Sequence, residues 1–331
     1  RTTTLFPYTT LFRSPWMMAF LHLLDLSQGE RDLESIIMRK NHRKGMTSMA
    51  ILDETRNEIL AALGTAAEEA TVERVVVGIF FTGVKLSTGK GGLCFTPVKE
   101  IPEAVCCPSS AGRIRDPRRI NGTRAVALLD DLYSREPLRR AMGVAALNAL
   151  SSAYWERNDP TDYEIRGNKN AQDLIPIMPD KKVTVIGALA PVLQKLKKHG
   201  GTWWVVEQDP RTLRKDEMDH FVPAGRADEA IGQADILVIT GVTLLNHTLE
   251  GILQKAAGGA DIYLMGPTAG MLPGPLFARG VRVIGVIRVK RPNEVLDVLA
   301  AGGSGYHIFD DLAERIVLVR SEKALSGQHL P

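Results

Sequence analysis

The stretch VTVIGALAPVLQKLKKHGGTWWVVE, residues 183–207, indicates the fold of the C-terminal half. It begins with a short apolar strand, Val183 to Gly187, and continues with a helix from Pro191 to His199 that a proline starts. A second apolar strand, Thr202 to Val206, follows and ends in Glu207. A strand, a helix and a second strand in this order are typical of a parallel sheet.

The same alternation continues towards the C-terminus. The expected elements are strands at Ala234–Thr240, Asp261–Met265 and Val281–Ile287, and helices at Thr243–Ala257 and Pro292–Ala301, the last stopped by Gly302-Gly303. Crossovers of this kind are right-handed and cover both faces of a parallel sheet with helices. The C-terminal half is therefore predicted to be an α/β domain.

The N-terminal half has a different pattern. The expected elements are an amphipathic helix at Ile51–Leu63 ending at Gly64, a strand at Val72–Val84, a turn at Ser87–Gly92 and a strand at Leu93–Val98. From Thr123 the pattern becomes helical, most strongly in LRRAMGVAALNALSSAYW after Glu136-Pro137. These features predict a small α+β domain in which helices pack on a short meander.

A polar stretch from Glu156 to Asn170 interrupts both patterns and is the best candidate for a domain boundary. We expect one domain at residues 46–165 and a second at residues 166–331. Within the first 45 residues, LFPYTTLFRS at positions 5–14 matches the translation of a widely used sequencing-library adapter. We interpret residues 1–45 as a non-native, disordered leader, with Met46 or Met49 as the natural start. The alternative is a genuine disordered tail.

Composition excludes several classes of function. The net charge of +3 is spread over both signs, which predicts no nucleic-acid partner. The three cysteines, Cys94, Cys106 and Cys107, are too few for a secreted disulfide framework and favour a cytoplasmic location. No apolar run approaches the roughly 18 residues that cross a bilayer, so no membrane association is expected.

Open parallel sheets bind ligands at the carboxyl ends of their strands. The residues at those predicted ends are Gly187, Glu207, Thr240-Gly241 and Gly266-Pro267-Thr268. Glu207 follows Gly187 by the spacing at which a dinucleotide-binding fold places its ribose-binding carboxylate. The loop Gly187–Pro191 has one glycine where the pyrophosphate fingerprint needs three, so classical NAD(P) binding is not expected. A different small ligand in the same crevice and a carboxylate that merely caps a loop both remain open.

Longer motifs carry a resemblance to a known family. VVVGIFFTGVKLSTGKGGLCFTP followed by LRRAMGVAALNAL resembles the enolase-N-terminal-like domain of the putative heavy-metal chelation proteins. VTVIGALAP, VVEQDP, ADILVITGVTLLNHTLEGIL and LMGPTAGMLPGPLFARGVRVIGV resemble the Rossmann-like domain that follows it. The resemblance covers residues from about 50 to 310. It implies a Rossmann-like domain docked on an enolase-N-like cap, with a ligand site at their interface.

Mapped onto this sequence, the resemblance gives a set of candidate ligand-binding residues. They are Thr82, Gly83, Gly91, Gly92, Asn148, Gly187, Glu207, Thr240, Gly241, Asn246, Thr248, Gly266, Pro267 and Thr268. Asn246 and Thr248 fall in the first turns of the expected helix after Gly241, where free N–H groups favour a phosphate or carboxylate. The alternative is that Thr243 caps this helix and Asn246 bonds a neighbouring loop. Asn148 lies in an apolar helix, so its amide either ties the cap to the crevice or makes a structural bond.

The sequence does not predict a resident metal site. Soft metals bind thiolate and imidazole at converging spacings, and no C-x-x-C or H-x-x-x-H is present. Cys106 and Cys107 are adjacent, while Asp219-His220, His247 and Glu207 could converge only through tertiary structure. A transient or ligand-borne metal fits better. There is also no G-x-S-x-G motif and no P-loop.

Two functions of different class follow from these features. The first is an enzyme or metal-handling factor that binds a small anionic, metal-chelating ligand with Glu207 as its polar anchor. The second is a non-catalytic carrier or sensor of such a ligand. Neither the reaction nor the metal is predicted. Homo-oligomers are common among such folds, but no exposed stripe in the sequence identifies one.

Overall fold

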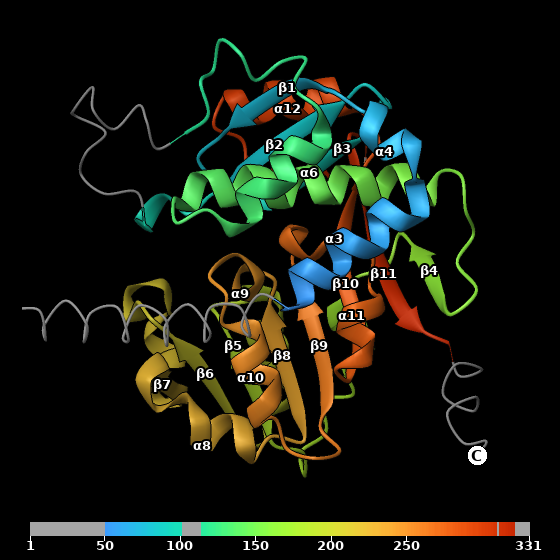
Figure 1. Cartoon of the computed structure of the whole chain (residues 1–331). Helices are drawn as coiled ribbons and strands as arrows, with labels where there is room; N and C mark the ends of the chain where they lie inside the picture. Colours follow the sequence, from blue (N-terminus) through green and yellow to red (C-terminus); the bar gives the residue numbers. More distant parts are fainter. Residues whose placement is uncertain (1–49, 101–113, 310, 322–331) are drawn as a thin grey trace, which may run out of the picture. The chain divides into compact units, whose positions relative to one another are not determined.

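The computed structural model describes residues 50–100, 114–309 and 311–321, all within one unit that spans residues 48–331. The expected leader at residues 1–45, together with Cys106 and Cys107, lies outside the described residues. The chain forms a mixed α/β structure with a small antiparallel sheet and a large, mostly parallel sheet (Figure 1).

The large sheet has eight strands in the order β4-β11-β10-β9-β8-β5-β6-β7. The strands are β4 Tyr163–Gly167, β5 Val183–Ile186, β6 Trp203–Glu207, β7 Phe221–Pro223, β8 Ile236–Thr240, β9 Asp261–Met265, β10 Val281–Val289 and β11 Ala313–Arg320. All neighbours from β7 to β10 are parallel, whereas β11 is antiparallel to both β10 and β4. Chain order reverses at the contact between β5 and β8, where a crevice can open.

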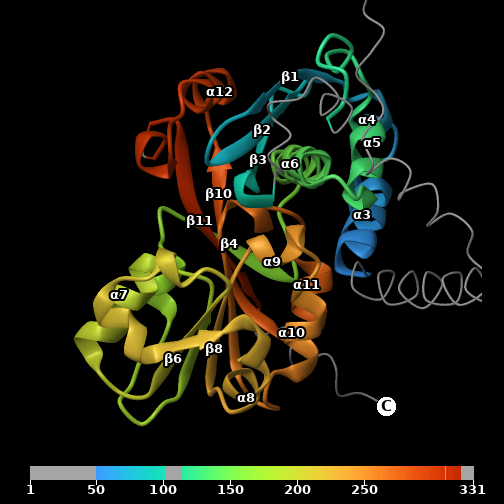
Figure 2. The ribbon, with the colours of Figure 1, turned by 90° about the vertical axis from the view of Figure 1, so that its left-hand side faces the viewer.

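Helices cover both faces of this sheet. Successive residues of a strand point to opposite faces, so each strand contributes side chains to two apolar clusters. Val185 and Val205 pack with α7 (Ala190–His199) in one apolar cluster. Their neighbours Ile186 and Val206 belong to the larger cluster on the other face, with α8 (Ala227–Gly232) and α10 (Leu249–Lys255). Figure 2 shows α7 and α8 separated by the sheet. This double burial accounts for the continuous apolar runs of the parallel strands.

The small sheet consists of β1 (Val72–Val77), β2 (Phe81–Leu86) and β3 (Gly91–Phe95) in an antiparallel meander. Helix α6 (Pro137–Trp155) packs closely on it. A Cβ at Gly92 would lie 2.1 Å from the carbonyl oxygen of Ala145, so this contact requires glycine. The other helices around the small sheet and beside the strands are α3 Ala50–Leu63, α4 Thr65–Glu69, α5 Ala125–Leu129, α11 Gly274–Ala278 and α12 Pro292–Ala300.

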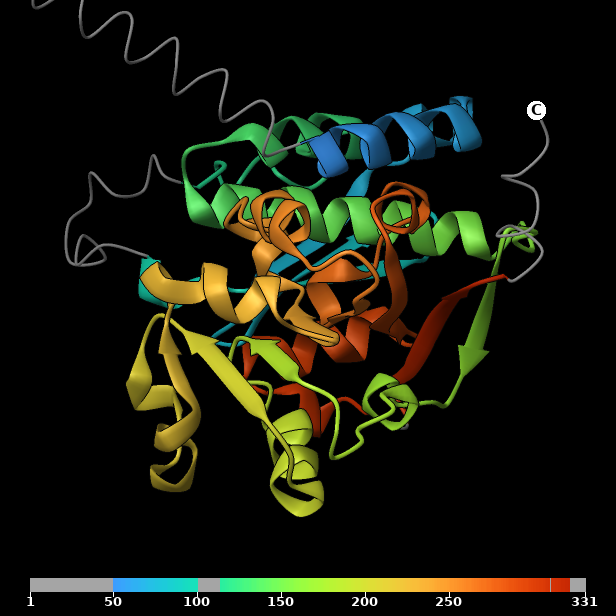
Figure 3. The same ribbon diagram turned by 90° about the horizontal axis from the view of Figure 1, so that it is seen from below.

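Segments from distant parts of the sequence are interleaved. Helices α3 and α6 lie side by side (Figure 3). Helix α12, from the C-terminal half, packs on β1 and β2, where Arg74 pairs with Asp297 at 2.7 Å. Strand β4 lies within the polar stretch at residues 156–170 and contains the expected boundary. None of the described helices is long and apolar enough to cross a membrane.

The expected single strand at Val72–Val84 is wrong, because this segment is the hairpin of β1 and β2. Gly78 N–H donates to the carbonyl of Phe81 at 3.0 Å and closes the turn. The turn residues Ile79 and Phe80 are apolar but exposed, so the sequence looks continuous where the chain reverses. A Cβ at Gly78 would lie 2.7 Å from the Leu299 carbonyl oxygen, which explains the glycine.

The expected helix at Thr243–Ala257 is also wrong as a continuous element. It is split into α9 (Val242–Leu245) and α10, with His247 between them at a φ of 58°. The Thr248 hydroxyl donates to Asn246 Oδ1 at 2.7 Å, and Thr248 N–H donates to the Thr243 carbonyl at 3.0 Å. These local hydrogen bonds replace the helical ones. Strands β4, β7 and β11 and helices α4, α8 and α11 are not among the elements expected from the sequence.

Candidate functional site

A cavity of about 710 Å³ lies over the carboxyl ends of β5, β6 and β8. We call it the strand-end cavity. Residues that follow these three strands form one side, and α8 and α10 form another. The segment from Phe95 to Glu100, which includes the short helix η1 (Val98–Glu100), adds a wall from the small sheet. The cavity is therefore lined by residues from both halves of the chain.

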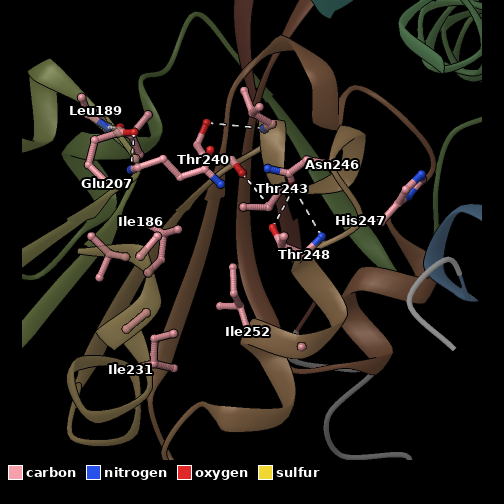
Figure 4. Close-up of a pocket in the computed structure, with 18 of the residues that line it drawn as sticks. Ile186, Leu189, Glu207, Ile231, Thr240, Thr243, Asn246, His247, Thr248 and Ile252 are labelled. Carbon is pink, nitrogen blue, oxygen red and sulfur yellow. Dashed lines mark hydrogen bonds between the residues drawn. The ribbon is translucent and has the colours of Figure 1, made fainter. Parts of the chain in front are cut away.

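The lining combines an apolar body with a few polar groups. Ile186, Ile231 and Ile252 lie below Thr240 in Figure 4 and form the apolar part. Glu207 and Asn246 lie on opposite sides of Thr240 in the same view. An apolar cavity with a few convergent polar groups is the usual form of a small-ligand site, since the apolar walls bury the ligand and the polar groups orient it.

Glu207 both lines the cavity and caps a loop. Its Oε2 accepts a hydrogen bond from Ala188 N–H at 3.0 Å, and its Oε1 accepts from Gln208 N–H at 2.7 Å. Gly187 has a φ of 91°, and a Cβ there would lie 2.8 Å from the Cγ2 of Thr240. The carboxylate thus joins the loops after β5 and β6. Carboxylate oxygens have further lone pairs, so Glu207 can also accept a bond from a ligand.

The turn after β8 is held by its own side chains. The Thr243 hydroxyl donates to the Thr240 carbonyl at 2.7 Å. Asn246 follows α9 and Thr248 precedes α10, so neither is in the first turns of one long helix as expected. Both side chains line the cavity, but α9 and α10 are too short to supply the anion site that the helix dipole would give.

Gly187, Glu207, Thr240, Asn246 and Thr248 are the predicted site residues that line the strand-end cavity. The other predicted residues are not among those that line it. Thr82, Gly83, Gly91 and Gly92 lie in the small sheet, Asn148 lies on α6, and Gly241, Gly266, Pro267 and Thr268 lie in the turns after β8 and β9. Helix α6, β3 and the turn after β9 meet at one junction.

Asn148 makes the central contact of this junction. Its amide group donates to the carbonyls of Leu93, at 2.7 Å, and of Pro267 and Thr268, each at 3.1 Å. The Thr268 hydroxyl in turn accepts from Phe95 N–H at 3.1 Å. Asn148 thereby ties α6 to β3 and to the turn after β9. This places Phe95, the last residue of β3, at the cavity wall.

Several lining residues were not predicted from the sequence. Lys99 and Glu100 reach the cavity from the small sheet, and Lys99 Nζ pairs with Asp209 Oδ2 at 2.7 Å across to the loop after β6. The guanidinium of Arg211 and then this lysine hold the pKa of Asp209 well below its usual range. The partners are more than a hundred residues apart, and no local pattern links them.

His247 also lines the cavity, next to the buried Arg140. Among the described residues, its Nδ1 has no hydrogen-bond partner although it is buried. Burial lowers the pKa of His247 to about 4, and the nearby charge of Arg140 contributes. The imidazole is therefore neutral at pH 7. Burial likewise lowers the pKa of Arg140, although a guanidinium stays charged in proteins.

The described residues do not fit a resident heavy-metal centre. Within residues 50–100, 114–309 and 311–321, no group of three or more His, Cys, Asp or Glu side chains converges to hold an ion. Cys94 is buried, and burial raises its pKa to about 12, so it is a thiol and not the thiolate that binds metals. His220 is stacked on Trp203 and bonded to its carbonyl at 3.0 Å.

Two family models match the chain, and both are described as "Putative heavy-metal chelation". One matches residues 60–151 and the other residues 170–318. An uncharacterized protein of Methanocaldococcus jannaschii is 34% identical over 138 residues, which are 41% of this chain and 49% of that protein. The match thus spans about half the length of this curated relative.

Two solved structures share the fold. A protein of unknown function from Pyrococcus horikoshii, of the DUF364 family, has a TM-score of 0.64 at 20% identity and covers 81% of this chain and 98% of its own. A protein of the same family from Desulfitobacterium hafniense has a TM-score of 0.62 at 16% identity, covering 83% and 99%. At these identities the likeness shows the fold alone.

Proposed function

Because this chain belongs to the family described as putative heavy-metal chelation, we propose that it binds a small metal-chelating ligand in the strand-end cavity. One observation carries the proposal. The cavity is well formed and mostly apolar, but the described residues offer no set of metal donors around it. A metal handled here is therefore held chiefly by the ligand that brings it, with Glu207 as the protein's polar anchor for that ligand.

The strand order supports this location. From β7 through β6, β5, β8 and β9 to β10, the sheet has the order of a dinucleotide-binding Rossmann fold, and the cavity lies where chain order reverses. Glu207 ends the second of these strands, as a ribose-binding carboxylate would. The loop after Gly187 lacks the further glycines that let a backbone approach a pyrophosphate. We therefore favour a compact ligand over NAD(P).

A non-catalytic carrier or sensor is the second candidate, and the environment of Glu207 favours it. Both of its carboxylate oxygens already accept main-chain hydrogen bonds. The carboxylate is thereby held in one orientation with both oxygens acting as acceptors, which suits holding a ligand more than removing a proton. An enzyme would need a further acid or base besides Glu207, a role for which the lining offers His247 and Asp228.

Native mass spectrometry with elemental analysis tests the proposal on full-length protein purified anaerobically. We expect a small molecule, with or without a metal, at a stoichiometric level, and its loss in Glu207→Gln, which retains an acceptor for Ala188 N–H. Glu164→Gln, on the exposed face of β4, is the matched control and should keep the ligand. Equal retention by both variants would remove Glu207 from the site.

A further inference from the structure

Arg140 is a buried arginine behind the end of the strand-end cavity nearest the small sheet. It is 9% exposed and is held by main-chain carbonyls. Its Nε donates to the Leu245 carbonyl at 3.0 Å, and its Nη1 donates to the carbonyls of Ser134 and Arg135, also at 3.0 Å. These contacts tie the first turns of α6 to the end of α9. They orient the guanidinium rigidly but leave its positive charge intact.

The charge of Arg140 is only partly neutralised. Among the described residues, its Nη2 makes no hydrogen bond, and the nearest carboxylate oxygen is Glu100 Oε2 at 3.6 Å. Glu100 is 43% exposed on its side chain and lines the cavity, so water competes for this contact. A buried cation normally has a well-aligned anionic partner, because an unpaired charge in the interior is costly. Within the described part of the chain, this guanidinium has only the 3.6 Å contact with Glu100.

His247 adds a second unfilled polar position at the same place. Its buried Nδ1 has no hydrogen-bond partner in the part of the chain that the structure describes, and its backbone has a φ of 58°, which is unusual for a residue other than glycine. Figure 4 shows its ring turned away from Thr240 and Glu207. Strained conformations of this kind persist where the surroundings impose them, and they cluster at ligand sites. Glu100 and His247 therefore mark one end of the cavity, with Arg140 behind them.

We propose that this end of the cavity is an oxyanion subsite, in which a phosphate or carboxylate group of the ligand binds Arg140 Nη2 and displaces Glu100. The inference rests on the proposed function of the cavity and adds the chemical class of one part of the ligand. Its anionic group lies beside Glu100 and His247, and its apolar body extends over Ile186 and Ile252. A charge-assisted hydrogen bond to Nη2 then replaces the 3.6 Å contact with Glu100.

Titration of the full-length protein with inorganic phosphate and, separately, with acetate at constant ionic strength tests the subsite. Glu100→Gln removes the competing carboxylate, so the affinity for at least one anion should increase about threefold, the effect of one partly exposed ion pair. Arg140→Met should weaken binding roughly tenfold. Glu156→Gln, at the opposite end of α6, removes a surface carboxylate of the same helix and should leave the affinity unchanged. The anion that binds with the higher affinity identifies the ligand group as phosphate or carboxylate.

Histidine resonances locate the bound anion. His247→Asn identifies the His247 signal and keeps a residue that tolerates positive φ. Phosphate or acetate should shift this signal in the wild-type protein and shift it further, at equal concentration, in Glu100→Gln. If Arg140→Met does not fold, the affinity of Glu100→Gln for the two anions still tests whether the subsite exists. No saturable binding of either anion, or equal affinities in Glu100→Gln, Glu156→Gln and wild type, would overturn the subsite. A copurified ligand that depends on Glu207 would nevertheless leave the cavity function in place.

Discussion

At the scale of single residues, His247 gives a test of the electrostatics of the site. Its pKa is lowered from 6.5 to about 4, so we expect its imidazole to remain neutral at pH 5.5 while an exposed histidine is mostly protonated. The unfolded chain takes up this proton more readily than the folded chain. The contribution of His247 to stability is therefore complete above about pH 6.5 and is lost as the pH falls towards 4. An NMR titration midpoint near 6.5 for His247 would contradict the buried environment of its imidazole.

Asn148 gives a second residue-scale prediction. Asn148→Leu removes the donor that three carbonyls share, two of them buried and one partly buried, so the free energy of unfolding should fall by about 1–3 kcal/mol. Asn158→Leu is the control, because Asn158 follows the same helix, is exposed and makes one bond, to the Tyr154 carbonyl. Urea denaturation compares the two. Equal decreases in the free energy of unfolding of the two variants would show that Asn148 does not hold the junction between the sheets.

Part of the site could be predicted from residue types. Gly187 follows β5, and Glu207 and Thr240 are the last residues of β6 and β8. The carboxyl ends of parallel strands converge, and all three residues line the strand-end cavity. Arg140 and Glu100 could not be found in this way. The sequence of an apolar helix does not show whether an arginine in it is buried or exposed. Two partners of Arg140, Leu245 and Glu100, are distant in the sequence, and only the tertiary structure brings them near.

At the scale of secondary-structure elements, the contact between β3 and α6 predicts opposite effects for two glycines. Gly92→Ala places a Cβ 2.1 Å from the Ala145 carbonyl oxygen and should destabilise the protein by about 1–3 kcal/mol or more. Gly251→Ala, inside α10 with nothing within 4 Å, should stabilise it by about 0.5–1 kcal/mol. Thermal melts measure both. A neutral Gly92→Ala would mean that the two elements are not closely packed.

Elements with a long, uniform pattern were predicted well, such as α3, α6, α7 and the central parallel strands. The errors have physical causes. The hairpin of β1 and β2 turns through exposed apolar residues, and the α9–α10 break is stabilised by hydrogen bonds between neighbouring side chains. Strand β7 has only three residues, and β4 is a mostly exposed strand with polar side chains. The two strands form the edges of the large sheet. Edge strands this short or polar have no periodic signal.

At the scale of the whole molecule, one apolar cluster runs through both halves. It includes Ile51 and Leu147 from the first half and Leu237 and Ile284 from the second. We therefore expect a single cooperative unfolding transition, with equal calorimetric and van't Hoff enthalpies. Differential scanning calorimetry measures this directly. Two resolved transitions would instead support independent folding of the domains proposed at residues 46–165 and 166–331.

The central claim is that a small ligand occupies the strand-end cavity and brings any metal with it. The most direct test is a crystal structure of the full chain purified anaerobically, with anomalous diffraction recorded for the metals that elemental analysis finds. We expect electron density between Ile231 and Ile252 that reaches Glu207, with any anomalous peak inside that density. An empty cavity, with the metal bound by protein side chains elsewhere, would contradict it.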